Sequence, residues 1–177
     1  MKTITTAAAG LSVMLLLAAC GAREITDIPP MVQLQRIQIE SNHVRLALRI
    51  DNANSIAVSG GRLSFQLQLE GQPFASHDSA VQLDIVANNA EVVPINVTPG
   101  DGDMQRLRAL VRSDARELRW SMQGKLKLDQ SLESTFETRG RCFAVPGQQQ
   151  MLRCTGSAAE GPESREGRQR RRTDFGA

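Results

Sequence analysis

Alternation of apolar and polar residues over residues 44–69 constrains the fold of this chain more than any other feature. The apolar positions are Val44, Leu46, Leu48 and Ile50 and, after a turn at residues 51–54, Leu63, Phe65, Leu67 and Leu69. A β-strand sends successive side chains to opposite faces of its sheet. The stretch therefore predicts two half-buried strands, each with one apolar face directed toward a core.

Two irregularities in the pattern predict local features of the strands. Between residues 31 and 40 the apolar positions change phase near Arg36, which predicts a β-bulge because a shift of one residue would otherwise turn the strand over. Pro94 lies inside the apolar run 93–97 and has no N–H to donate to a neighbouring strand. This run therefore predicts an edge strand or a bulged strand.

One segment has the spacing of a helix instead of a strand. Met104, Leu107, Leu110 and Val111 recur every three or four residues after a loop at residues 98–103. Strand alternation returns at residue 118. The pattern predicts an all-β domain over residues 31–146, an antiparallel β-sandwich of about seven strands with one short α-helix before the last two strands.

The N-terminal segment has the features of a secretion signal. Lys2 precedes an apolar run that is shorter than the roughly 20 residues of a transmembrane helix. The segment ends in Leu17-Ala18-Ala19-Cys20, which resembles the bacterial lipobox. This resemblance implies that residues 1–19 are removed and that Cys20 carries lipid, and an ordinary signal peptide with an incidental cysteine is the alternative.

Residues 20–30 are expected to tether the domain to a membrane through the lipid on Cys20. Acyl chains stabilise such an anchor by about 0.8 kcal/mol per buried methylene. Gly21 follows Cys20 where an aspartate would favour the inner membrane. The expected location is therefore the bacterial cell envelope, with the outer membrane favoured and the domain facing the periplasm.

Composition excludes several classes of partner. The net charge is only +2, which gives no general attraction for nucleic acid. Aromatic residues make up 3% of the chain, too few for base-stacking surfaces or for most carbohydrate platforms. We therefore expect no nucleic-acid partner, while an envelope protein remains a possible partner.

Cys142 and Cys154 remain as a pair once Cys20 is assigned to lipid. In an oxidising periplasm such a pair predicts a disulfide, here one that closes a loop at residues 147–155 and contributes about 3 kcal/mol in the chain-entropy model. A redox pair is the alternative, and the absence of Cys-x-x-Cys spacing disfavours it. Residues 156–177 are rich in arginine and poor in apolar residues, which predicts a disordered tail that is either solvated or in contact with anionic lipid or cell-wall polymers.

Three stretches resemble the type 2 late-embryogenesis-abundant domain, also called the water-stress and hypersensitive-response domain. They are residues 46–54, which resemble a strand that leads into an Asn-Pro-Asn turn, residues 61–71 and residues 118–129. Ala53 stands where the family usually has proline. The resemblance implies an immunoglobulin- or fibronectin type III-like sandwich of seven strands with one helix, a role in water stress and no enzymatic activity.

Few residues are candidates for a site. Asn52 and Asn54 of the family-motif turn either bind a ligand or, as is more common in turns, bond to the backbone. His43 and His77 are too few for a convincing metal set, and residues 101–103 are favoured as a helix cap over a calcium loop. The sequence predicts no catalytic residue, no metal and no cofactor.

Three functions follow from these observations as hypotheses. The first is a non-enzymatic, lipid-anchored envelope protein that acts in desiccation or envelope stress. The second is a binding or accessory module that docks on an envelope complex or holds a lipid-like ligand between its sheets. The third is an enzyme, which would require a polar cluster in a cleft.

Overall fold

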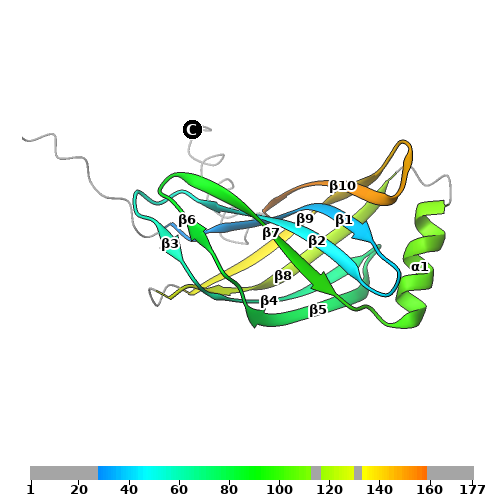
Figure 1. Cartoon of the computed structure of the whole chain (residues 1–177), viewed down its shortest axis with the longest axis horizontal. Helices are drawn as coiled ribbons and strands as arrows, with labels where there is room; N and C mark the ends of the chain where they lie inside the picture. Colours follow the sequence, from blue (N-terminus) through cyan, green and yellow to red (C-terminus); the bar gives the residue numbers. More distant parts are fainter. Residues whose placement is uncertain (1–27, 113–116, 130–132, 159–177) are drawn as a thin grey trace, which may run out of the picture.

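The computed structural model describes residues 28–112, 117–129 and 133–158 (Figure 1). The predictions for residues 1–27, which include Cys20, and for the tail beyond residue 158 lie outside the described residues. Within the described part, no helix is long and apolar enough to cross a membrane.

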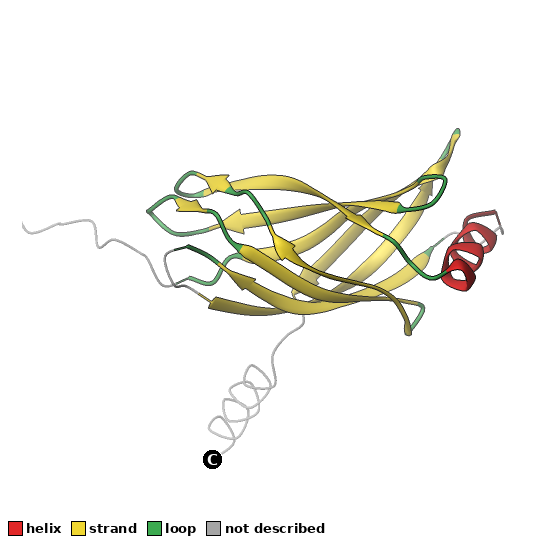
Figure 2. Ribbon diagram, turned by 60° about the horizontal axis from the view of Figure 1, so that its bottom comes forward, coloured by secondary structure: helices red, strands yellow, loops and turns green. Residues whose placement is uncertain are grey.

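Eight antiparallel strands form one sheet in the order β5-β4-β8-β9-β10-β1-β2-β7 (Figure 1). These strands are β1 (Met31–Ile39), β2 (Val44–Asn52), β4 (Arg62–Leu69), β5 (Gln72–Ala80), β7 (Asn89–Val97), β8 (Leu118–Lys127), β9 (Glu133–Val145) and β10 (Gln148–Ala158). Two short strands, β3 (Val58–Ser59) and β6 (Asp84–Ile85), pair with each other. The long sheet curls around its own core, so that its edge strands β5 and β7 approach each other (Figure 2).

The antiparallel all-β fold with one helix is confirmed, and two details differ from the prediction. The long strands belong to one curled sheet and not to two separate sheets. Three strands follow the helix, because β10 occupies the predicted loop at 147–155 and the first residues of the predicted tail. Leu152 and Cys154 are the buried residues of this strand among those whose burial the structure describes, so its alternation is weak. Its place is set by backbone pairing with β9 and β1 on its two sides.

Both irregularities in the pattern are found where they were predicted. The register of β1 against β2 shifts between Leu34 and Arg36, which is the expected bulge. Pro94 lies in β7, an edge strand of the sheet. The turn between β4 and β5 has positive φ at Glu70 (51°) and Gly71 (75°), the geometry of a tight two-residue hairpin that matches the twist of its strands.

The core lies inside the curl and is made mainly of Leu, Val and Ile. The predicted apolar positions of β2 and β4 are all buried there, and each is at most 3% exposed. The helix α1 (Asp101–Arg112) stands at one end of the sheet and buries Met104 and Leu107 against the core (Figure 2). Asp101 and Asp103 lie in its first turn and Arg112 in its last, an arrangement that suits the helix dipole.

Candidate functional site

Asn52 lies at the end of β2 and is 1% exposed. Its Nδ2 donates hydrogen bonds to the carbonyl oxygens of Ile56 (2.8 Å), Val86 (3.2 Å) and Ile85 (3.3 Å). Its Oδ1 accepts from the backbone N and the Nδ2 of Asn54, both at 3.0 Å. One amide side chain therefore fixes the loop after β2 to the segment between β6 and β7.

Asn54 extends this arrangement to the beginning of the domain. The side chain is fully buried, its Nδ2 donates to Ile28 O, and its Oδ1 accepts from Ile28 N, both at 2.9 Å. The backbone oxygen of Asn54 accepts from Asn88 N at 2.9 Å. We call Asn52 and Asn54 the asparagine clamp. Because every side-chain nitrogen and oxygen in the clamp has a partner, the geometry supports the structural interpretation over ligand binding.

Cys142 and Cys154 lie directly opposite each other in β9 and β10, with their Cα atoms 3.9 Å apart, and form a disulfide. Both are buried on the inner face of the sheet. The bond links two neighbouring strands instead of closing an irregular loop. The disulfide therefore adds a covalent link between β9 and β10 to their backbone pairing.

His77 and Ser79 come closest to a nucleophile and base among the described residues. The His77 Nε2 lies 2.9 Å from Ser79 Oγ, and Ser79 Oγ also donates to Ala80 O at 3.2 Å. The imidazole stacks on Phe65 with ring centroids 5.3 Å apart. No carboxylate within the described ranges orients the other ring nitrogen of His77, so the pair lacks the third member of a catalytic triad.

Burial lowers the pKa of His77 below its ordinary value of 6.5, and the nearby Asp78 carboxylate partly opposes this shift. The unfolded chain then binds a proton at a higher pH than the folded chain does. Stability should therefore be fully present above about pH 6.5 and decline as the pH falls through the unfolded and then the folded pKa of His77.

We expect His77→Phe, which keeps a ring against Phe65, to flatten that part of the pH dependence. The measurement is the urea midpoint of both proteins between about pH 7.5 and pH 4.5. Parallel pH profiles for the two proteins would contradict the prediction.

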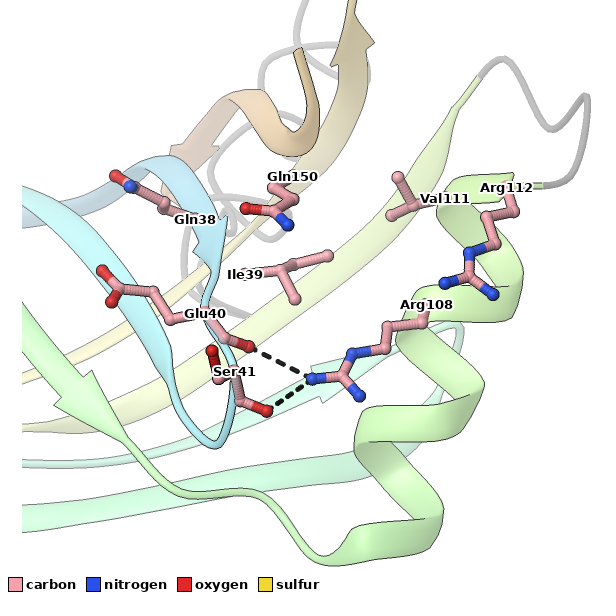
Figure 3. Close-up of a pocket in the computed structure, with 8 residues that line it drawn as sticks. All are labelled: Gln38, Ile39, Glu40, Ser41, Arg108, Val111, Arg112 and Gln150. Atoms are coloured by element: carbon pink, nitrogen blue, oxygen red, sulfur yellow. Dashed lines mark hydrogen bonds between the residues drawn. The ribbon is translucent and has the colours of Figure 1, made fainter.

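A polar hollow of about 610 Å³ lies between α1 and the turn that joins β1 to β2 (Figure 3). It is lined by Gln38, Ile39, Glu40, Ser41, Arg108, Val111, Arg112 and Gln150. The Nη2 of Arg108 donates to Ser41 O at 2.6 Å and to Glu40 O at 3.2 Å, which ties the helix to the turn. The Glu40 carboxylate instead pairs with Arg45 at 3.3 Å and lies 3.5 Å from Nε2 of His43, so the hydrogen bonds of Arg108 in the hollow go to backbone oxygens and not to a carboxylate.

Beneath the helix, a much smaller space adjoins the core. It measures about 10 Å³ and is lined mostly by Leu110, Val111, Leu118, Cys142, Ala144 and Leu152. A space of this size holds at most about one water molecule. It gives no support to a lipid held inside the sheet.

Metal binding also finds no support in the described residues. Across 28–112, 117–129 and 133–158, no three His, Cys, Asp or Glu side chains come together in a way that could hold a metal ion. Asp103, in the segment considered above as a calcium loop, instead forms an ion pair with Arg106 at 3.0 Å.

Comparison with known proteins identifies the family. The model of the late embryogenesis abundant protein family LEA_2 matches residues 47–140, more than half of the chain. The protein belongs to the LEA_2 family. The matched LEA_2 region includes the asparagine clamp and α1 and ends inside β9, so β1 and β10 lie outside it.

Two solved structures resemble this LEA_2 protein. A protein from Arabidopsis thaliana, solved in solution, is 18% identical, with a TM-score of 0.47 over 70% of this chain and 88% of its own. A crystal structure of a protein from Archaeoglobus fulgidus is 6% identical, with a TM-score of 0.40 over 65% of this chain and 96% of its own. No curated protein matched the sequence. Membership of the LEA_2 family supports a non-enzymatic protein.

Proposed function

We propose that this LEA_2 protein is a non-enzymatic protein of the bacterial envelope, anchored by lipid on Cys20, that protects the cell during water loss. Membership of the family carries the proposal. The Leu17-Ala18-Ala19-Cys20 sequence supports the anchor. A folded domain without chemistry of its own would act through its surface, by contact with membrane or protein.

The asparagine clamp supports a position close to the membrane. Asn54 holds both backbone groups of Ile28, so the domain begins at a fixed point at the end of β2. Only seven residues lie between Cys20 and Ile28. Fully extended, such a tether spans about 28 Å. Even with a fully extended tether, the domain would therefore stay near the bilayer surface.

The test combines location with survival. A strain that lacks the protein is complemented with the wild type, with Cys20→Ala or with the control Gly21→Ala, which keeps the lipid-bearing cysteine. We expect Cys20→Ala to leave the membrane fraction and Gly21→Ala to remain in it, because only the former loses the acyl chains. After drying and rehydration, the wild type and Gly21→Ala should restore survival and Cys20→Ala should restore less.

Each part of the proposal has its own contrary outcome. Tight membrane association of Cys20→Ala would contradict the lipid anchor. Wild-type survival of the strain that lacks the protein would contradict the protective role.

A second candidate is an accessory module that docks on an envelope complex. Three large apolar side chains around the asparagine clamp are exposed, Ile28 (39%), Met31 (41%) and Val86 (54%). Exposed apolar groups that lie together favour a contact surface. Crosslinking from the anchored protein separates the two candidates, because a stoichiometric protein partner would favour the module.

A further inference from the structure

The outer face of strands β8, β9, β10 and β1 is rich in arginine. Five arginines project from it, Arg36, Arg119, Arg139, Arg141 and Arg153, and we call them the arginine face. Four of these residues form two cross-strand pairs in which the members lie directly opposite each other, Arg36 with Arg153 and Arg119 with Arg141. Figure 1 shows β9, β10 and β1 side by side.

Only part of this charge is balanced within the protein. Arg119 pairs with Glu70 at 3.2 Å, and Arg141 pairs with Glu117 at 3.0 Å. Arg36, Arg139 and Arg153 form no ion pair with any residue that the structure describes. Like charges directly opposite each other destabilise a sheet. The arginine face therefore keeps a repulsion that an anionic partner would relieve.

The shape and the neighbours of the arginine face fit a phosphate-bearing surface. A shallow hollow of about 500 Å³ is lined by Arg119, Arg139 and Arg141, and Glu70, the partner of Arg119, is the one carboxylate in its lining. Phe143 lies directly opposite Arg153 and is 40% exposed, which places an aromatic ring among the cations. Aromatic and basic side chains together are typical of surfaces that lie at the membrane interface.

We propose that the arginine face rests on a bilayer that contains anionic phospholipid, with its guanidinium groups bound to lipid phosphates. Guanidinium groups bind phosphate oxygens through paired hydrogen bonds, which suits arginine to this role better than lysine. The inference deepens the proposed function, since it names the partner of this face for a chain held at the membrane.

The test is arginine footprinting of the full protein, isolated from membranes in detergent and reconstituted into vesicles. One set of vesicles contains phosphatidylcholine alone, and in the other about one lipid in three is phosphatidylglycerol. Phenylglyoxal labels accessible arginines, and mass spectrometry reads each position. We expect labelling of Arg36, Arg139 and Arg153 to fall about tenfold in the anionic vesicles and to recover at about 0.5 M salt. Equal labelling in both sets of vesicles would overturn the proposal.

A charge reversal separates loss of binding from loss of folding. Arg153→Glu places a carboxylate opposite Arg36, so we expect a melting temperature that is unchanged or higher. Each charge near an anionic surface changes binding about fivefold, so the reversal should weaken docking of the face about 30-fold and expose Arg139 to the reagent. A lower melting temperature together with unchanged protection of Arg139 would overturn the assignment.

Arg62→Glu is the control for net charge, because it changes the net charge equally and also places a carboxylate opposite a cation, Lys127, although it removes the ion pair of Arg62 with Asp78 as well. It lies in β4, outside the arginine face, and should leave the protection of Arg139 intact. An equal effect of the two variants would show that only net charge matters and overturn the proposal. The proposal would also be overturned if soluble polyphosphate, added to phosphatidylcholine vesicles, protected the arginine face as well as the anionic vesicles do. Binding to phosphatidylcholine vesicles alone reports the Cys20 anchor, so the two proposals fail separately.

Discussion

Replacing Asn52 by alanine is expected to lower the free energy of unfolding by about 3 kcal/mol. The substitution removes the side chain that joins Ile56, Ile85 and Asn54, and it leaves buried polar groups without partners. Each unpaired buried group costs about 1–3 kcal/mol, and access of water at the partly buried carbonyls reduces the sum. Urea denaturation followed by circular dichroism measures the change.

Asn96→Ala is the matched control for this prediction. Asn96 is exposed on the edge strand β7, and the same substitution there should change stability by less than about 0.5 kcal/mol. A similar small effect at Asn52 would mean that the clamp contributes little, and the structural interpretation of the Asn52–Asn54 turn would lose its main support.

Replacing Gly124 by alanine is expected to destabilise the protein by a similar amount, about 3 kcal/mol. A Cβ atom at this position would overlap Ser64 O and lie 2.8 Å from both Phe65 Cβ and Phe136 Cζ. The Ser64 carbonyl belongs to β4, which pairs with β8 on that side, so it moves only if the pairing of the two strands is disturbed. Thermal and urea denaturation measure the loss.

Gly102→Ala is the control: it is the same substitution, but we expect it not to destabilise the protein. Gly102 lies in the first turn of α1, and a Cβ atom there would meet nothing within 4 Å. Alanine in a helix is favoured over glycine by up to about 1 kcal/mol, so this variant should be as stable as the wild type or more stable. If Gly124→Ala and Gly102→Ala have the same stability, close packing does not explain the glycine at position 124.

Features that depend on local spacing could be predicted from the sequence. The phase change near Arg36 predicts the bulge, Pro94 predicts the edge strand, and the spacing of Met104 and Leu107 predicts the helix. Each of these patterns lies within a few residues of the feature it predicts.

Strands β5 and β10 could not be predicted from the spacing of apolar residues. β5 has His77 and Ser79 in the same phase as the buried residues of β4, because it lies at the edge of the sheet, where the inner face is only partly covered. β10 has few buried residues and is fixed by backbone pairing on both sides. Apolar alternation does not report backbone pairing, which is also why the single curled sheet was predicted as two.

In the candidate sites, too, the role of a residue could be predicted from the local sequence, but its distant partners could not. The sequence indicated that Asn52 and Asn54 satisfy backbone groups, but their partners at residues 28 and 85 are distant along the chain. The arginine face depends on the register that places Arg36 opposite Arg153, and that register exists only once β10 is in the sheet. Long-range pairing, which local patterns do not contain, determines both.

The two edge strands of the curled sheet bear on how the protein behaves at high concentration. Drying concentrates proteins until they touch, and a free strand edge is then a template for pairing between molecules. Here β7 carries Pro94, which has no N–H to donate, while β5 carries the exposed Asp78, and the curl brings the two edges toward each other. We therefore expect the two edges of this sheet to have little tendency to pair with neighbouring molecules when the protein is concentrated.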